Sequence, residues 1–438
     1  FSGPAVSGVC PSTISGVMTA SCSLSGGASL VVTNSGTIAS SPVPESIVVT
    51  GTVGSLSNSG LISASSIAIH LTSANMSGNI SNGGTIVGPG GIILSTSVIT
   101  GSVNNSGLIS ASSYGVGVFY STVTGTINNS GTIESGINVT NGVIAAIDNS
   151  DLLAGGIYTG LGLFGSATII GNVNNSGTIN GVTGIALALS TIGGDIDNSL
   201  TGVIVGSNNA IQLISSSTLS SNITNQGVIS GGATGIYVDN SSIAGNISNV
   251  GLIQGGTIGA AINLKSGAVI GSSITNNGNI QGFDGINILG SRIVNDISNA
   301  GIIVATDTGI GIFGSTISGK LVNSGSLSAT GNAINLVSST ILGGILNTGV
   351  ISGNIELGTV STNVLSLASG STIISAATLT NTTRYNLGNE ADSLGDSTIT
   401  GSYNNGTISF ASVGAVTAAS LGVLEVDLVN TTVGSFGS

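Results

Sequence analysis

The sequence predicts an all-β fold: a right-handed, single-stranded parallel β-helix (β-solenoid) of about 17 coils with about 24 residues each. Three observations predict it, namely a motif that returns at a nearly constant interval, β-branched residues that alternate with polar ones, and an unusual composition. Strands this short cannot bury their apolar faces alone, so successive coils must stack at the ~4.8 Å spacing of paired strands. The prediction is an elongated, three-sided body about 80 Å long.

The composition excludes an ordinary globular chain. Gly accounts for 72 of the 438 residues, aromatic residues for 3% and charged residues for only 5%, against ~25% charged in average proteins. Ile, Val and Leu must therefore provide the core. A hydrophobic content of 40% argues against disorder. Ser, Thr, Asn or Gly also interrupts every apolar run before it reaches the ~20 residues of a membrane helix.

The charge and the N-terminal segment indicate where the protein works. A net charge of −12, from 16 acidic and 4 basic residues, leaves no basic stripe, so we expect no nucleic-acid partner. The chain begins at Phe1 without a charged and apolar leader, as a secreted product or a shortened chain would. Cys10 and Cys22 are expected to form a disulfide that closes an irregular cap of residues 1–30; two free thiols are the alternative.

A repeat with a central asparagine organises the chain. The segments at 121–133, 241–253, 315–327 and 339–351 share the template Ser-Thr-Ile, x, Gly, x, Ile, x, Asn, x, Gly, x, Ile. Stacking places like residues over like, so we expect the anchor asparagines to form a hydrogen-bonded ladder. The anchors are Asn34, Asn58, Asn82, Asn105, Asn129, Asn149, Asn175, Asn198, Asn225, Asn249, Asn276, Asn299, Asn323 and Asn347.

Each coil carries three short apolar segments. One precedes the anchor, as at Ile127, one follows the glycine, as at Ile133, and the third is a Gly-Ile-x-Ile/Leu stretch, as at Ile185 and Leu187. Their period of two indicates short strands with one buried face, burying about six aliphatic side chains per coil. The glycine two positions after the anchor is interpreted as a corner that needs a positive φ.

The regular solenoid is expected over residues 31–350. Residues 351–438 are interpreted as a less regular continuation, with an insertion of about ten residues after Asn347 and further anchors at Asn381, in 402–408 and in 428–430. Extra residues in a solenoid must protrude as loops. Recognition surfaces are therefore predicted in the four long intervals, Asn149–Asn175, Asn198–Asn225, Asn249–Asn276 and Asn347–Asn381.

The succession INNSGTI (127–133), GIALAL (184–189) and STI (190–192) resembles the passenger domains of bacterial autotransporters (type V secretion) and filamentous haemagglutinin-like β-helical surface proteins. The resemblance covers nearly the whole chain. It implies a non-enzymatic adhesin or exported passenger, secreted or at the cell surface, that attaches cells to surfaces, to biofilm or to one another through glycans or proteins. The family's C-terminal membrane barrel has no counterpart before Ser438, so we expect that it was removed or that export follows another route.

Self-assembly is the alternative function. The segment 428–438 still carries the repeat and contains no charged tail or proline to blunt its edge. This end could join an anchor or dock onto a second copy, giving an extracellular filament or surface layer by head-to-tail stacking.

A polysaccharide-degrading enzyme is the remote alternative, because such enzymes share the solenoid fold. The best carboxylates are Asp195 and Asp197, which flank the inward Ile196, with Asp148 in an equivalent place two coils earlier. The basic residues are scattered along the chain: Lys265, Arg292, Lys320 and Arg384.

Other chemistry finds little support in the sequence. His70 lies between two apolar residues and is expected to face solvent, with no Ser or Cys motif near it. The calcium-binding nonapeptide of other solenoids is absent, and the Thr columns are too irregular for ice binding. We expect no enzyme, no cofactor and no metal.

Overall fold

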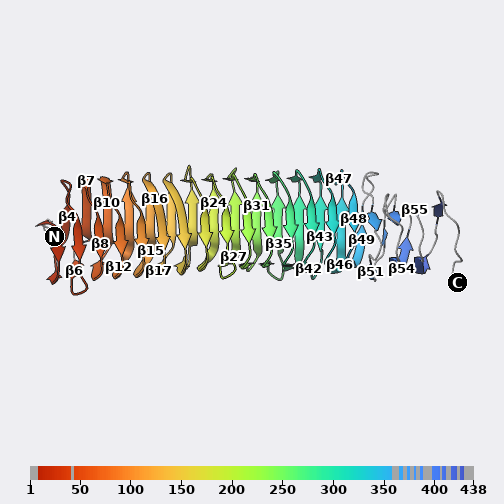
Figure 1. Ribbon diagram of the computed structural model, residues 1–438, viewed down its shortest axis with the longest axis horizontal. Helices are drawn as coiled ribbons and strands as arrows, with labels where there is room; N and C mark the ends of the chain where they lie inside the picture. The colour runs from red at the N-terminus through yellow and green to blue at the C-terminus, as the bar shows by residue number, and fades with distance from the viewer. Residues whose placement is uncertain are drawn as a thin grey trace. The chain divides into compact units, whose positions relative to one another are not determined.

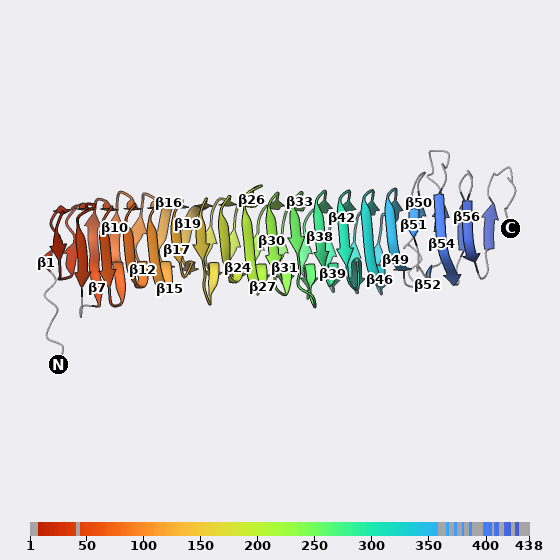
Figure 2. The same ribbon diagram turned by 90° about the horizontal axis from the view of Figure 1, so that it is seen from below.

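The computed structural model describes residues 8–40 and 44–357, and beyond them the backbone of short strands between residues 365 and 428. These residues form β-strands and turns, without a helix. They belong to two compact units, Phe1–Ser221 and Asn222–Ser438. In each unit, strands of successive coils lie side by side in chain order (Figures 1 and 2).

The paired strands of successive coils run parallel, and their register places equivalent residues of the two coils opposite each other. In the first unit, β24 (Thr178–Ala188) lies between β21 (Thr159–Phe164) and β27 (Val203–Ile214), with Ile185 opposite Leu161 and Ile211. In the second unit, β46 (Ser326–Val337) pairs in the same way with β43 (Ile310–Phe313) and β49 (Val350–Glu356). The predicted parallel β-solenoid is confirmed, with about 14 turns rather than 17.

The core consists of aliphatic columns that run from coil to coil. A regular coil buries five large aliphatic side chains rather than the expected six, because the anchor asparagine takes the remaining inward position. Each buried aliphatic side chain contributes roughly 2 kcal/mol before the entropy of ordering it is subtracted. In the coil between Asn105 and Asn129 these residues are Ile109, Val116, Val118, Val123 and Ile127.

The described N-terminal residues form a short coil, and residues 1–7 of the predicted cap lie outside the described residues. The strands β1 (Gly8–Val9), β2 (Thr13–Ile14) and β3 (Val17–Met18) pair in parallel with the next coil. Gly8 lies opposite Cys22, and Cys22 lies opposite Ile47, so the first described coil is much shorter than the second. The solenoid therefore tapers towards its first described coil.

The corner glycines have a steric role, and the expected positive φ is wrong. Glycines such as Gly107 and Gly325 are not among the described residues with a positive φ. A Cβ at Gly107 would lie 2.1 Å from the carbonyl oxygen of Gly84, and one at Gly325 would lie 2.0 Å from that of Gly301. The backbones of stacked corners approach so closely that only glycine fits.

The left-handed residue of each coil lies elsewhere, immediately before the serine of Ser-Thr-Ile. Examples are Tyr120 (φ 50°), Leu189 (φ 55°), Asn240 (φ 45°) and Ser338 (φ 50°). This turn redirects the chain into the short strand that buries the Ile of Ser-Thr-Ile. Because the residue type varies so widely, the sequence did not indicate this second corner.

The coils after Asn347 are shorter than expected. Strand β48 (Ile345–Asn347) pairs with β50 (Leu365–Leu367), which places Leu367, rather than Asn381, opposite Asn347. Register then runs from Leu367 to Leu387 and Phe410, so the predicted insertion after Asn347 is wrong. Asn381, the anchor Asn405 of the segment 402–408, and the segment 429–438 with the proposed docking end lie outside the described residues.

Candidate functional site

The anchor asparagines form buried ladders inside each unit. The side-chain Nδ2 of each donates to the Oδ1 of the next, at 2.7–2.8 Å from Asn58 to Asn198 and again from Asn225 to Asn347. At most rungs the same amide also donates to its own corner; for Asn105 this acceptor is the carbonyl oxygen of Gly107 (3.2 Å). These side chains are at most 2% exposed, so the ladder belongs to the core and offers no surface for a ligand. Its members are Asn58, Asn82, Asn105, Asn129, Asn149, Asn175 and Asn198, then Asn225, Asn249, Asn276, Asn299, Asn323 and Asn347.

Asn34 does not belong to the ladder. The residue opposite Asn58 in the preceding coil is Val32, and Asn34 lies exposed in the turn that follows it. The corner from Val32 to Ile38 is longer than the corner from Asn58 to Ile62, and its extra residues displace the asparagine from the column.

A second buried ladder, which the sequence reasoning missed, is formed by the serine of Ser-Thr-Ile. The backbone N–H of Ser97 donates to Ser121 Oγ (2.9 Å), and that of Ser315 donates to Ser339 Oγ (3.1 Å). Most of these hydroxyls donate in turn to a carbonyl two positions earlier, as Ser121 does to Phe119 (2.8 Å). The signal was the recurrent position of serine in the repeat template.

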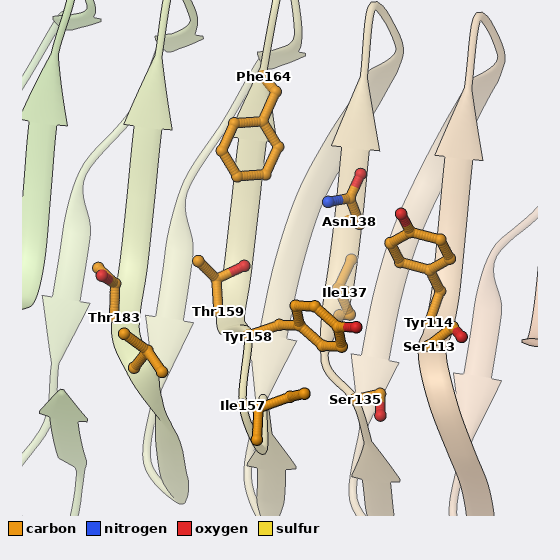
Figure 3. Close-up of a pocket in the computed structure, with 11 residues that line it drawn as sticks. Ser113, Tyr114, Ser135, Ile137, Asn138, Ile157, Tyr158, Thr159, Phe164 and Thr183 are labelled. Carbon is orange, nitrogen blue, oxygen red and sulfur yellow. The ribbon is translucent and has the colours of Figure 1, made fainter. Parts of the chain in front are cut away.

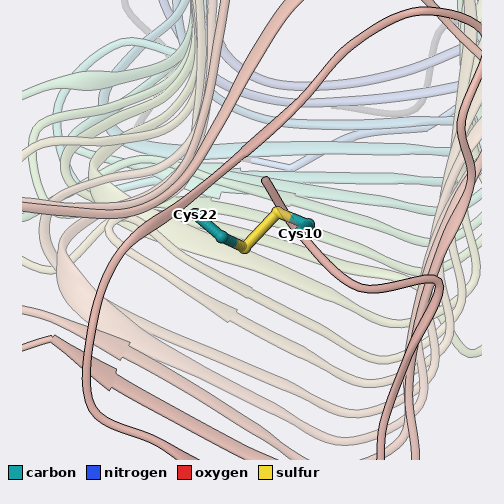
Figure 4. Close-up of a disulfide and its surroundings, with 2 residues drawn as sticks. All are labelled: Cys10 and Cys22. Carbon is teal, nitrogen blue, oxygen red and sulfur yellow. A yellow bond between two sulfur atoms is a disulfide. The ribbon is translucent and has the colours of Figure 1, made fainter. Parts of the chain in front are cut away.

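Cys10 and Cys22 form a disulfide in the structure (Figure 4). Their Cα atoms are 4.8 Å apart, and both side chains are buried. Cys22 occupies an aliphatic column, opposite Ile47. The bond thus ties the first described coil to the second.

The carboxylates expected to support glycoside chemistry are engaged with neutral neighbours. Asp148 and Asp197 share one outward column, with Asn174 between them, and Asn174 Nδ2 donates to Asp148 Oδ1 (2.6 Å). The hydroxyl of Ser221 donates to Asp195. The unit that contains them, residues 1–221, has no Lys or Arg in its sequence. No Lys or Arg therefore stands beside them in that unit.

The basic residues stay apart in the second unit. Lys265 Nζ lies 5.8 Å from the ring centre of Tyr237, whose hydroxyl donates to Asp239 Oδ2 (3.0 Å). Burial, followed by the hydrogen bond and charge of Asp239, raises the pKa of Tyr237 to about 12. Arg292 is exposed, the backbone N–H of Lys320 donates to Asp296 (2.7 Å), and Arg384 lies outside the described residues.

His70 lies on the outer face but is less open to solvent than expected. Its side chain is 19% exposed, its Nδ1 is 2.8 Å from Glu45 Oε1, and its Nε2 is 3.2 Å from Ser95 Oγ. One neighbour belongs to the preceding coil and the other to the following coil. The repeat length was the signal for this contact, because it places residues one coil apart in the sequence side by side.

A shallow groove of about 250 Å³ opens on the outer face of the first unit. It crosses β15 (Leu108–Phe119), β18 (Ile137–Thr140), β21 and the middle of β24. In Figure 3, Tyr114 and Tyr158 lie on the same face with Ile137 between them. The lining residues are Ser113, Tyr114, Ser135, Ile137, Asn138, Ile157, Tyr158, Thr159, Phe164, Val182 and Thr183.

The groove is aromatic, hydroxyl-rich and uncharged. Tyr114 and Tyr158 are 40% and 49% exposed, and the Tyr114 ring makes an edge contact with Phe119, with centroids 5.4 Å apart. The Phe164 ring lies against Gly162, where a Cβ would be 2.5 Å from it, so glycine is required beneath the ring. None of the lining residues carries a charge. Such a surface suits a neutral ligand with both apolar and hydroxyl faces.

Three longer coils expose aliphatic side chains at the places where their extra residues lie. Ile157 is 77% exposed, Leu200 79% and Ile258 85%. Ile157 and Tyr158 come from the turn before β21, inside the long interval Asn149–Asn175, and both line the groove. The extra residues after Asn198 enlarge its corner, where Asn198 Nδ2 donates to the carbonyl oxygen of Gly202 (3.0 Å).

Two further features bear on partners and cofactors. Among the described residues, no helix is long and apolar enough to cross a membrane. The same part of the chain contains no group of three or more His, Cys, Asp or Glu side chains that could hold a metal ion.

Comparisons with known proteins found no match among protein-family models, curated proteins or solved structures, so only the fold classifies the chain. The parallel coils and their stacked asparagines are consistent with a β-helical repeat protein, and that is the level at which the chain is classified.

Proposed function

We propose that this chain is an extracellular β-solenoid that acts as a surface adhesin or exported passenger, and that it attaches through neutral glycans. The observation that carries the proposal is the uncharged groove at Tyr114 and Tyr158. The coils serve as a rigid support that holds these side chains in place.

The chemistry of the groove favours glycans over other cell-surface ligands. A tyrosine ring offers an apolar face and a polar hydroxyl, which matches the two faces of a sugar ring. Ser113, Asn138 and Thr159 add hydroxyl and amide groups that can donate and accept hydrogen bonds. Without a charged residue in the lining, the groove gives an anionic ligand no ion pair.

An extracellular location is supported by the disulfide between Cys10 and Cys22, since such bonds persist mainly in oxidising compartments. The resemblance of the repeat to autotransporter passengers supports the same location. A surface whose polar groups come from Ser, Thr and Asn rather than from charged residues suits contact with uncharged polymers.

Self-assembly into a filament is the competing proposal, since the edge strands of a parallel solenoid can pair with the strands of a second copy. Electron microscopy of the purified chain at rising concentration distinguishes the two, because continuous fibres would favour the filament.

Attachment assays test the proposal directly. Beads coated with the purified chain should bind surfaces that carry neutral glycans, and raising the salt from about 0.05 M to about 1 M should leave attachment unchanged, because salt screens only charges. Polylysine-coated beads on an anionic surface are the control whose attachment falls. Attachment of the protein-coated beads that disappears at high salt, or never occurs on any glycan, would contradict the proposal.

A further inference from the structure

We propose that Ser95, His70 and Glu45 form an acyl-transfer site on the outer face of the first unit, in which Ser95 is the nucleophile. The three residues come from three successive coils, at the ends of β12 (Thr85–Ser95) and β7 (Glu45–Val53) and within β10 (Ile67–Met76). The site is separate from the groove at Tyr114 and Tyr158, and it would add an activity to the adhesive function.

The geometry has the order of a hydrolase triad. Ser95 Oγ is 3.2 Å from His70 Nε2, and His70 Nδ1 is 2.8 Å from Glu45 Oε1. These contacts also fix the tautomer of a neutral imidazole. An ionised carboxylate can only accept, so Nδ1 must carry the proton, and Nε2 is then the acceptor for the Ser95 hydroxyl. This is the arrangement in which histidine acts as a general base towards serine.

Charged residues are scarce in this part of the chain, so chance alone would rarely bring a carboxylate and an imidazole into contact here. Glu45 is the only Asp, Glu, Lys or Arg that precedes Glu134 in the sequence, and His70 is the only histidine of the protein. Within the described residues, no other His, Lys or Arg side chain lies within ion-pair distance of a carboxylate. No other charged side chain belongs to the three coils around the imidazole. With side chains 19% and 29% exposed, His70 and Glu45 are partly shielded while an ester can still approach.

The reaction that this geometry supports is ester hydrolysis in two steps. Ser95 Oγ attacks the carbonyl carbon as its proton passes to His70 Nε2, and Glu45 stays ionised and stabilises the imidazolium. The ester C–O bond then breaks, and the leaving alcohol takes the proton from Nε2. A water molecule attacks the acyl-serine with His70 again as base, which releases the acid and restores Ser95.

The surroundings of Ser95 restrict the substrate to esters with good leaving groups, such as aryl esters. The backbone N–H groups of Thr96 and Ser97 already donate to Phe119 O (3.0 Å) and Ser121 Oγ (2.9 Å), so they cannot stabilise an oxyanion. Of the nearby hydroxyls, that of Thr96 already donates to the carbonyl oxygen of Ser95 (2.8 Å), so the hydroxyl of Ser73, 3.3 Å from Thr96 Oγ1, is the donor that remains. Loss of backbone donors costs such sites about 10²–10³ in rate, which excludes amides in practice.

The proposal is tested on the purified chain with a fluorophosphonate probe and with 4-nitrophenyl acetate. Mass spectrometry should locate the probe on Ser95, and Ser95→Ala should abolish labelling and ester hydrolysis. His70→Gln should slow both by about 100-fold, the lower end of what a general base contributes. Ser110 is the internal control, since it donates directly to Glu134 (2.6 Å) without a histidine.

The outcomes separate catalysis from structure. Equal labelling of Ser95 and Ser110, or ester hydrolysis that survives Ser95→Ala, would overturn the proposal. Circular dichroism and attachment assays on each variant show whether the fold and the groove remain intact. A folded, adhesive His70→Gln variant with undiminished labelling would equally refute the role of His70.

Discussion

Replacing Asn105 by alanine should destabilise the coils around it far more than a small truncation normally would. Asn105 is 2% exposed and makes four side-chain hydrogen bonds. It donates to Gly107 O (3.2 Å), Asn129 Oδ1 (2.8 Å) and Thr132 O (3.1 Å), and it accepts from Asn82 Nδ2 (2.8 Å). Alanine leaves the buried Oδ1 of Asn129 without its donor, whereas Asn82 Nδ2 loses one acceptor and keeps Gly84 O (3.4 Å) and Leu108 O (3.2 Å).

The magnitude follows from the number of buried groups that lose a partner. A buried polar group left unsatisfied costs ~1–3 kcal/mol and a lost hydrogen bond ~0.5–1.5 kcal/mol, so Asn129 Oδ1 together with the bond lost at Asn82 predicts a loss of about 2–4 kcal/mol. Asn104→Ala is the matched control, because Asn104 faces outward and loses only the bond from Asn128 Nδ2 (2.7 Å). The control should cost about 1 kcal/mol or less.

Hydrogen exchange read by mass spectrometry is the suitable assay, since stacked coils open locally and need not unfold in one step. Asn105→Ala should lose amide protection in peptides between residues 80 and 132, while the peptides of the second unit keep theirs. Equal loss of protection in Asn105→Ala and Asn104→Ala would refute the ladder as a source of stability.

Three further substitutions test other parts of the account. Gly107→Ala places a Cβ 2.1 Å from the Gly84 carbonyl oxygen and should therefore lower the free energy of unfolding by about 3 kcal/mol. A urea titration measures this loss, and an unchanged unfolding midpoint would contradict the steric role of the corner glycine. Leu189→Gly removes a left-handed leucine (φ 55°) and should raise stability by up to about 1 kcal/mol, whereas Leu200→Gly, in a turn without a positive φ, should not. Burial raises the pKa of Asp284 above 3.8; the backbone hydrogen bond from Thr308 opposes this shift, and the charge of Asp307 adds a smaller rise. The charged form of Asp284 therefore destabilises the fold as the pH rises through this raised pKa. Asp284→Asn should therefore raise the unfolding midpoint at about pH 7 but not at about pH 3, and a gain at both values would point to another cause.

Much of the fold could be predicted because stacking forces like residues over like. The anchor spacing and the alternation around Ile127 suffice for parallel register and for the two ladders, Asn58 to Asn198 and Asn225 to Asn347. The exceptions arise where corner length matters. The extra residues after Val32 move Asn34 out of the column, and a motif search cannot detect such a shift.

The position of each repeated residue was easier to predict than the physical reason why that residue type is required there. A required glycine can reflect φ or close contact, and only the 2.1 Å approach of a Cβ at Gly107 to the Gly84 carbonyl oxygen distinguishes them. The groove was only partly foreseen. The long interval Asn149–Asn175 indicated a loop, but its partner Tyr114 lies in a regular coil and needed the three-dimensional register to be found.

Attachment of beads that carry groove variants tests the central claim most directly. Each stacked aromatic ring contributes ~0.5–1.5 kcal/mol, so Tyr114→Ser combined with Tyr158→Ser should weaken binding to a neutral glycan surface by about ten-fold or more. Tyr120→Ser is the matched control, since Tyr120 is 66% exposed but does not line the groove. The account predicts that the double variant detaches while the Tyr120→Ser beads hold as firmly as the wild type; equal attachment of all three would contradict it.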